Sequence, residues 1–180
     1  MVDIYKLKWT QLQLKIFSLL CLKAGEKLSQ REIAKILNVS PTAVANSLEE
    51  LKKSNLVKIE KTKTINFVSF NRDEEKAVEL KRVENLKNIY LSQLLNYLEI
   101  ELAGATIILF GSYSRGDDTL SSDIDIAIIG RKDKLLNLEK YEKILNRQIN
   151  INFYDSWKDI HKYLKNNILN GILLLGSIEL

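Results

Sequence analysis

The chain has 180 residues, 46% of them hydrophobic, which is enough for one medium domain or two small domains with packed cores. Its one cysteine, Cys21, excludes an internal disulfide framework, and because His161 is the only histidine we expect no zinc site. No apolar run approaches about 18 residues, and the first residues lack the apolar segment of a secretory signal. We therefore expect a cytoplasmic protein that does not associate with membranes.

The charge is divided unevenly along the chain. Residues 1–70 contain 12 Lys or Arg and 6 Asp or Glu, whereas residues 71–180 contain 15 and 17. The first part is therefore basic, with a net charge of +6, and the second part has a net charge of −2. Basic charge gathered in one part of a chain favours a polyanionic partner, although plain protein surfaces also carry such an excess.

Three helices are predicted in the first part of the chain. Residues 12–22 are largely apolar and predict a buried helix. Residues 29–32, Ser-Gln-Arg-Glu, form a capping box that begins a second helix ending near Leu37. Ser40 and Pro41 are typical of the cap and first turn of a third helix, in which apolar residues repeat on one side.

A β-hairpin is predicted next, from two apolar stretches at residues 56–59 and 64–70 around a polar turn at 60–63. Three helices, with a short turn between the second and third, followed by a hairpin resemble a winged helix-turn-helix domain. The resemblance covers residues 8–70, and we assign residues 1–70 to this domain.

The resemblance implies that the third helix recognises DNA. The nucleic-acid-binding residues we predict are the exposed polar residues of that helix and the lysines around it: Thr42, Asn46, Ser47, Lys52, Lys53, Lys61 and Lys63. The third helix has no Arg or Gln for a bidentate contact with a base. The alternative is therefore a winged helix that docks a protein or forms a dimer.

Residues 71–102 predict one long linker helix. An apolar stripe at helical spacing consists of Val83, Leu86, Tyr90, Leu94, Tyr97 and Leu98. We interpret this helix as a structural connector. The alternative function of its stripe is a homodimer interface.

A short apolar strand, residues 106–110, leads into a glycine-serine turn. Gly111 allows a sharp turn and a close approach to a ligand, because it has no Cβ. Ser112 offers a hydroxyl and an N–H to phosphate oxygens, and Arg115 offers a planar fork of donors.

A second strand, residues 123–129, carries two acids. Because side chains alternate along a strand, Asp123 and Asp125 point to the same face, about 7 Å apart. Two carboxylates so placed favour a cation between them. Mg²⁺ binds proteins through one or two carboxylates together with substrate phosphates.

The glycine-serine turn and the two aspartates carry a second resemblance to a known family. Gly-Ser, ten intervening residues and Asp-x-Asp are the signature of the minimal nucleotidyltransferases, which belong to the superfamily of DNA polymerase beta and the aminoglycoside nucleotidyltransferases. Arg115-Gly116 and Ser122 match as well. The resemblance covers residues 100–180. It implies that Gly111, Ser112 and Arg115 bind a nucleoside triphosphate, foremost ATP.

The same resemblance assigns Asp123 and Asp125 to metal binding and catalysis with Mg²⁺. The alternative is a strand-turn-strand whose acidic face is merely solvated. We therefore expect an α+β chain: a winged helix-turn-helix at 1–70, a long linker helix at 71–102, and a small mixed-sheet nucleotidyltransferase domain like the polymerase beta palm at 103–180.

One position departs from the family pattern. The family has a third catalytic carboxylate on a neighbouring strand, and the strand at residues 148–154 presents Asn150 there, with Asn152 on the same face. An amide is neutral and is not a base at neutral pH. Asp155 falls on the opposite parity. An amide at this position leaves three possibilities: a slow enzyme, an enzyme that uses a group of its substrate in place of the missing carboxylate, or a nucleotide-binding protein without catalytic activity.

The leading functional hypothesis is Mg²⁺-dependent transfer of a nucleoside monophosphate to a hydroxyl, with loss of pyrophosphate. The resemblance implies a protein acceptor, such as the toxin partner of an antitoxin, and a small molecule is the alternative acceptor. A second hypothesis is a DNA-binding transcriptional regulator whose nucleotidyltransferase domain only senses nucleotide. A third is a scaffold that binds neither DNA nor nucleotide.

Overall fold

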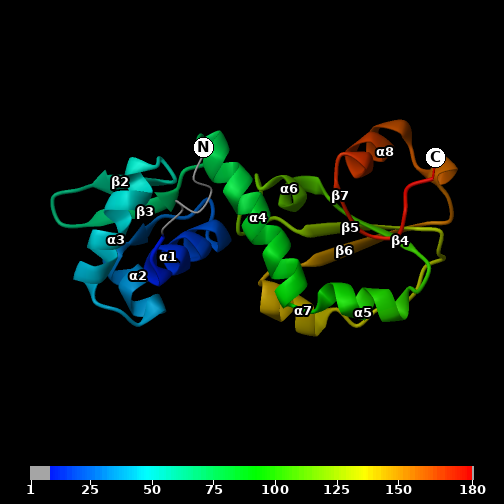
Figure 1. Ribbon diagram of the computed structural model, residues 1–180, viewed down its shortest axis with the longest axis horizontal. Helices are drawn as coiled ribbons and strands as arrows, with labels where there is room; N and C mark the ends of the chain where they lie inside the picture. The colour runs from blue at the N-terminus through cyan, green and yellow to red at the C-terminus, as the bar shows by residue number, and fades with distance from the viewer. Residues whose placement is uncertain (1–8, 180) are drawn as a thin grey trace, which may run out of the picture. The chain divides into compact units, whose positions relative to one another are not determined.

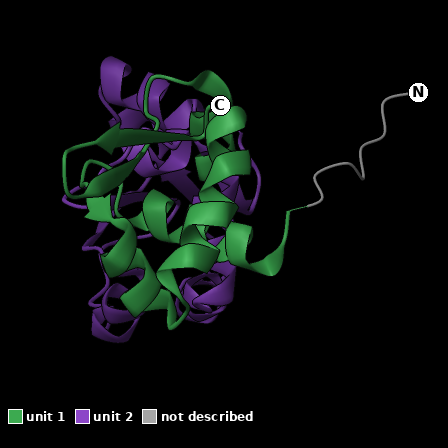
Figure 2. Cartoon of the chain, turned by 90° about the vertical axis from the view of Figure 1, so that its left-hand side faces the viewer, with its two compact units in different colours: residues 1–81 green, residues 82–180 purple. Residues whose placement is uncertain are grey.

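A computed structural model describes residues 9–179 (Figure 1). The chain divides into two compact units, residues 1–81 and residues 82–180 (Figure 2). The division falls within helix α4 (Glu75–Leu91), whose first residues belong to the first unit. In the part of the chain that is described, no helix combines the length and the apolar character needed to cross a membrane.

The first unit contains three helices and a small antiparallel sheet. The helices are α1 (Gln11–Leu22), α2 (Gln30–Leu37) and α3 (Pro41–Lys53), and the sheet has the order β1 (Leu28–Ser29), β3 (Asn66–Phe70), β2 (Val57–Lys61). The predicted winged helix-turn-helix is confirmed, and the fold class of the chain is α+β as expected.

Side-chain caps determine where these helices begin. The Ser29 hydroxyl accepts a hydrogen bond from the Glu32 N–H, and the Glu32 carboxylate accepts one from the Ser29 N–H. This second hydrogen bond is the main cause that lowers the pKa of Glu32. The Ser40 hydroxyl caps α3 by accepting a hydrogen bond from the Ala43 N–H, and Asn38 turns the chain between α2 and α3 with a positive φ of 53°. The cap signals in the sequence therefore located the starts of both helices correctly.

Two details of the hairpin differ from the prediction. The strands extend to Lys61 and resume at Asn66, so the loop lies at residues 62–65, where the Thr62 hydroxyl and N–H both bond the Ile65 carbonyl. The third strand, β1, was not predicted, because two residues are too few to show a strand pattern.

The second unit is built on a four-stranded sheet. Its order is β6 (Ile149–Tyr154), β5 (Ile124–Ile129), β4 (Thr106–Phe110), β7 (Ile172–Leu175), with β5 and β6 parallel and the other pairs antiparallel. Helices α5 (Leu94–Glu101) and α7 (Glu139–Leu145) lie on one face, and α8 (Lys162–Leu169) lies on the other (Figure 1). Alternation along β5 places Ile124, Ile126 and Ile128 in the core with α5 and α7. Asp125 therefore shares the face of Ala127 and Ile129, the face covered by α8.

The single long helix predicted for residues 71–102 is broken. It consists of α4 and α5, separated at Ser92 and Gln93, where Gln93 has a positive φ of 65°. Part of the apolar stripe is exposed on α4, where Val83 is 65% exposed and Tyr90 is 48% exposed. Asn85 is buried there because its amide donates hydrogen bonds to partners in the second unit's core, which sequence periodicity does not reveal.

Candidate active site

The glycine-serine turn lies directly against one of the two acids. β4 ends at Phe110, which pairs with Asp125 on β5, and the five-residue helix α6 (Gly111–Arg115) begins at once. Gly111 has a positive φ of 76°, and a Cβ on it would lie 2.4 Å from Asp125 Oδ2. Only glycine fits this position without displacing the carboxylate.

The two acids and Asn150 form one cluster. Asp125 lies opposite Asn150 across the parallel strands β5 and β6, and Asp123 immediately precedes β5. Asn150 Nδ2 donates hydrogen bonds to Asp123 Oδ2 at 3.1 Å and to Asp125 Oδ1 at 3.3 Å. Asp155 lies beyond the other end of β6, where it lines a cavity with Gly130 and Arg131. The structure therefore joins Asp123, Asp125 and Asn150 and separates Asp155 from them.

This cluster has the chemistry of a site for a hard cation and phosphate. Asp123 and Asp125 are both half-buried, and the Asn150 N–H₂ group supplies the positive end of a dipole between them. Within residues 9–179, no three His, Cys, Asp or Glu side chains are grouped closely enough to hold a metal ion by themselves. The two carboxylates nevertheless fit Mg²⁺, which is bound through one or two carboxylates plus substrate phosphates.

Arg115 is held at the end of the same turn. Its Nε lies 3.2 Å from Asp117 Oδ2 and its Nη1 lies 3.4 Å from Asn167 Oδ1 of α8. The guanidinium is about half exposed, so a phosphate can approach it from solvent. Arg115 and the half-buried Ser112 are on α6, which places both beside Gly111.

A buried polar network lies beneath the site, and sequence reasoning missed it. Asn85 Nδ2 donates to the Tyr113 carbonyl at 2.9 Å and to Asp118 Oδ1 at 2.7 Å, and Arg147 Nη2 lies 3.6 Å from Asp118 Oδ2. Asp118 is 1% exposed and Arg147 is 6% exposed. The network joins α4, the segment after α6 and the segment that precedes β6. Burial, followed by the charge of Asp118, raises the pKa of the Tyr113 phenol, so this hydroxyl stays neutral.

A cavity of about 540 Å³ opens beside Asp123. Its walls come from the segment before β5, from α7 and from the segment before β6: Leu120, Ser121, Ser122, Asp123, Glu139, Glu142, Lys143, Asn146, Arg147 and Gln148. Since α7 forms one of its walls, this cavity lies on the β6 side of β5 and towards the sheet face covered by α5 and α7, opposite to the face to which Asp125 points.

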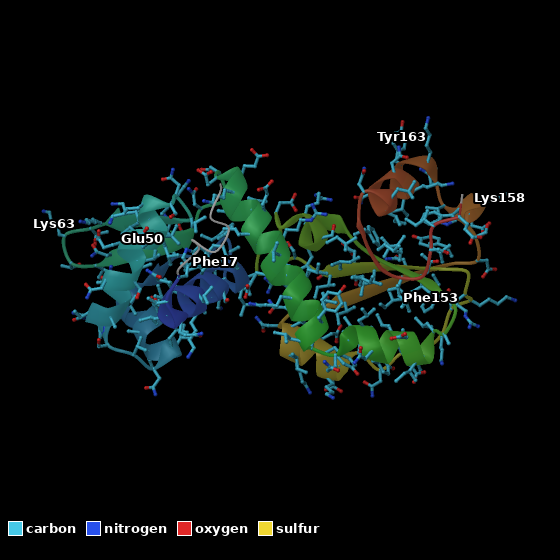
Figure 3. The ribbon with its side chains drawn as sticks, viewed as in Figure 1. Phe17, Glu50, Lys63, Phe153, Lys158 and Tyr163 are labelled. Atoms are coloured by element: carbon cyan, nitrogen blue, oxygen red, sulfur yellow. The ribbon has the colours of Figure 1, made fainter. Side chains whose placement is uncertain are left out.

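The predicted nucleic-acid-binding residues occupy two regions of the first unit. Lys63 projects from the tip of the β2–β3 hairpin (Figure 3). It lines a groove of about 400 Å³ with Pro41, at the start of α3, and with Gln30, Arg31 and Asn66. Neither Gln30 nor Arg31 was predicted, because both face the groove only through the packing of α2 against the hairpin.

The remaining residues of this set lie along α3 and β2. Thr42 and Asn46 are exposed and Ser47 is half-buried, whereas Lys61 is exposed at the end of β2. Lys52 follows Thr42 by ten residues, which is about 15 Å along the helix axis. Lys52 and Lys53 therefore lie at the far end of α3 from the groove, and Lys53 faces Glu50 at 3.7 Å.

Comparisons with known proteins agree with this geometry. Residues 91–175 match the family model of a nucleotidyltransferase domain, and residues 13–64 match that of an HTH domain. A Methanocaldococcus jannaschii protein named "Putative protein adenylyltransferase MJ0604" is 36% identical over 83 residues, covering 36% of this chain and 83% of its own. "Putative protein adenylyltransferase MJ0435" of the same organism is 40% identical over 67 residues, covering 34% of this chain and 69% of its own. No solved structure matches the chain.

The chain belongs to the nucleotidyltransferase-domain family and carries an HTH domain ahead of that domain. The predicted resemblance to nucleotidyltransferases is confirmed, as is the predicted helix-turn-helix. The roles of individual site residues stay predictions.

We predict that Gly111→Ala destabilises the protein and weakens nucleotide binding, because the new Cβ forces the Asp125 carboxylate to move. Gly130→Ala is a matched control, since Gly130 also has a positive φ, of 84°, but a Cβ there meets nothing within 4 Å. The control therefore loses only the free energy of unfolding that a left-handed backbone costs a non-glycine residue, about 1–2 kcal/mol. Denaturant unfolding and the thermal shift with ATP and Mg²⁺ measure both effects. Equal losses in the two variants would show that Asp125 does not restrict this position.

We also predict that Asp118→Ala lowers the free energy of unfolding by about 3–5 kcal/mol, because it removes the carboxylate that faces the buried Arg147 guanidinium. Asp117→Ala, one residue earlier, removes a carboxylate from an exposed pair with Arg115 and changes stability by less than about 1 kcal/mol. Urea unfolding of both variants is the measurement, and similar small losses would contradict a role for the buried pair.

Proposed function

We propose that this protein transfers a nucleoside monophosphate, foremost adenylate from ATP, to a hydroxyl group with release of pyrophosphate. One observation carries the proposal: the Gly111 backbone lies against the Asp125 carboxylate, and Asp123 points to the same face of the strand. A phosphate chain that follows this turn passes directly over both acids.

Each residue then has a defined task. Asp123 and Asp125 hold Mg²⁺, which neutralises the phosphate charge when bound. The α6 backbone and Ser112 bind the phosphate oxygens, and Arg115 exchanges its contact with Asp117 for a phosphate. This exchange costs little free energy, because an exposed ion pair contributes only about 0–1 kcal/mol to stability. The acceptor hydroxyl attacks the α-phosphorus, and the bond to pyrophosphate breaks.

We propose a protein as the acceptor, and specifically a partner such as a toxin that is inactivated by modification. The support comes from the two M. jannaschii relatives, whose names describe protein adenylyltransferases. The cavity beside Asp123 is open and lined mainly by polar side chains, which suits a protruding side chain. A small-molecule hydroxyl is the alternative acceptor.

We predict that Asn150→Asp raises the rate of transfer, because it supplies the third carboxylate beside Asp123 and Asp125. Asp123→Asn reduces transfer to background. The measurement is incorporation of label from α-³²P-ATP with Mg²⁺, with the protein alone and with the product of the adjacent gene. Transfer that is unchanged in both variants would leave the proposed site without a role.

A second candidate function is a DNA-binding regulator that senses nucleotide. The amide at Asn150 and the basic first unit favour it. Sensing requires that nucleotide bind the DNA-bound and DNA-free forms with unequal affinity. Both functions coexist if the protein represses its own operon and also modifies a partner. Binding of neither DNA nor nucleotide would leave only a scaffold.

We predict that Lys63→Gln weakens DNA binding equally across sequences and reduces the slope of log affinity against log salt by about 1, because one phosphate contact is lost. Lys23→Gln is the control, since Lys23 is in the same unit but pairs with Glu26 after α1. Fluorescence anisotropy over a salt series tests both variants. An affinity that is indifferent to salt would remove the DNA-binding proposal.

A homodimer through α4 is also proposed. Val83 is 65% exposed and Leu91 is 71% exposed, and they lie two helical turns apart on one side of α4. Burying this pair in a symmetric contact would remove apolar surface from water.

A further inference from the structure

We propose that Asn167 of α8 is a positioning residue for Arg115. Its neutral amide oxygen aims the Arg115 guanidinium at the triphosphate and keeps its contact when a phosphate displaces Asp117. The inference rests on the proposed function, in which Arg115 exchanges its pair with Asp117 for a phosphate. It adds to the nucleotide site a residue from a helix that lies far from the glycine-serine turn in the sequence.

The two contacts of Arg115 use different parts of its guanidinium. Nε lies 3.2 Å from Asp117 Oδ2, whereas Nη1 donates a hydrogen bond of 3.4 Å to Asn167 Oδ1. In a guanidinium, Nε and Nη2 form one edge that suits bidentate binding of a phosphate, and Nη1 does not belong to that edge. Within residues 9–179, Nη2 makes no hydrogen bond or ion pair. Asn167 therefore holds Arg115 by an atom that a phosphate on the Nε–Nη2 edge does not need.

The two partners of Arg115 also differ in charge. The Asp117 carboxylate competes with phosphate for the guanidinium, and because this pair is exposed, a phosphate displaces it at little cost. The Asn167 amide accepts its hydrogen bond without neutralising the cation. Once Asp117 is displaced, Asn167 still limits the rotamers of this long side chain, so less conformational entropy is lost when the phosphate binds.

Asn167 is itself held by the strand that ends at the glycine-serine turn. The next residue, Ile168, is 0% exposed and packs in one cluster with Phe110 of β4. Gly171, which follows α8, lies so close to β4 that a Cβ on it would be 2.4 Å from the Leu109 carbonyl oxygen. Since α6 begins directly after Phe110, α6 and α8 are both fixed to the end of β4.

The position of Arg115 along α6 indicates which phosphates it meets. Arg115 is four residues beyond Gly111, which lies against Asp125, so it is about 6 Å further along the helix axis. In the proposed function the α-phosphate reacts at the two acids, and the terminal phosphates extend along α6 to Arg115. The contribution of Asn167 therefore depends on the terminal phosphates, which ATP has and AMP lacks.

The test is a double-mutant cycle on the full chain, with dissociation constants for ATP and for AMP measured by calorimetry in the presence of Mg²⁺. Asn167→Ala weakens ATP binding about threefold to tenfold, the effect of one lost hydrogen bond, and changes AMP binding less than about twofold. In an Arg115→Gln background, Asn167→Ala changes ATP binding less than about twofold, because the side chain that it positions is absent.

Asn166→Ala is the matched control. Asn166 is exposed on the same helix, and the substitution alters helix propensity equally, but Asn166 has no hydrogen bond to Arg115 in the described part of the chain. It changes neither dissociation constant more than about twofold, which is less than the smallest effect of one hydrogen bond expected at Asn167. Melting temperatures close to that of the natural chain show that the variants fold.

Asn167→Asp tests whether the neutral charge of the amide matters. It keeps an oxygen at the same place but adds a charge that competes with phosphate for Arg115. It therefore weakens ATP binding more than Asn167→Ala does, and the excess shrinks as salt is raised. Asn166→Asp adds the same charge one residue away and weakens ATP binding less. An Asn167→Asp chain that binds ATP as the natural chain does would contradict the inference.

The outcomes separate this inference from the proposed function. Equal losses on Asn167→Ala in both backgrounds, or a loss that AMP shares, would make Asn167 a structural residue, and no loss would show that Arg115 is oriented without it. Each of these results overturns the inference alone. ATP binding that is indifferent to Arg115→Gln overturns the inference and the role assigned to Arg115. A natural chain that does not bind ATP overturns the proposed function as well.

Discussion

Repulsion between Asp123 and Asp125 is the constraint around which the second unit is organised. Two carboxylates on one face of a strand, half-buried, require positive charge or donor hydrogens nearby. The Asn150 amide supplies two such hydrogen bonds, and a divalent cation would supply more. The glycine at 111 leaves room for the Asp125 carboxylate at the point where the phosphate chain would pass. The repulsion between these two carboxylates is the reason for proposing a magnesium nucleotide as the ligand of the site.

The buried network explains why this arrangement is held in place. Asn85 comes from α4, Asp118 from the segment between α6 and β5, and Arg147 from the segment that leads into β6. An ion pair in the interior contributes little net stability, but it restricts the chain to the geometry that pairs it. α6 therefore keeps a fixed position relative to the start of β6. Preorganisation of this kind lets a small sheet with few helices hold its acids within reach of one ligand.

Much of this site was predictable from the sequence, for a physical reason. Strand alternation fixes the common face of Asp123 and Asp125, and the parallel strand that follows must place its acid or amide beside them, as Asn150 shows. The burial of Asp118 and Arg147 was not predictable, because their partners are distant in the chain. The long helix is broken at Gln93, which adopts a left-handed backbone conformation that the spacing of apolar residues does not indicate. The groove at Lys63 depends on packing between α2 and the hairpin, so Arg31 was missed while Lys52 was included.

The exposed place of Asn150 on an edge strand has a consequence for how this protein evolves. Asparagine and aspartate codons differ by one base, and the Asn150 side chain lies in solvent at the start of β6, away from the packed interior. The exchange of amide for acid therefore alters charge without disturbing the core. A lineage can gain or lose the third acid in a single mutational step and keep the same fold, the same turn and the same two aspartates.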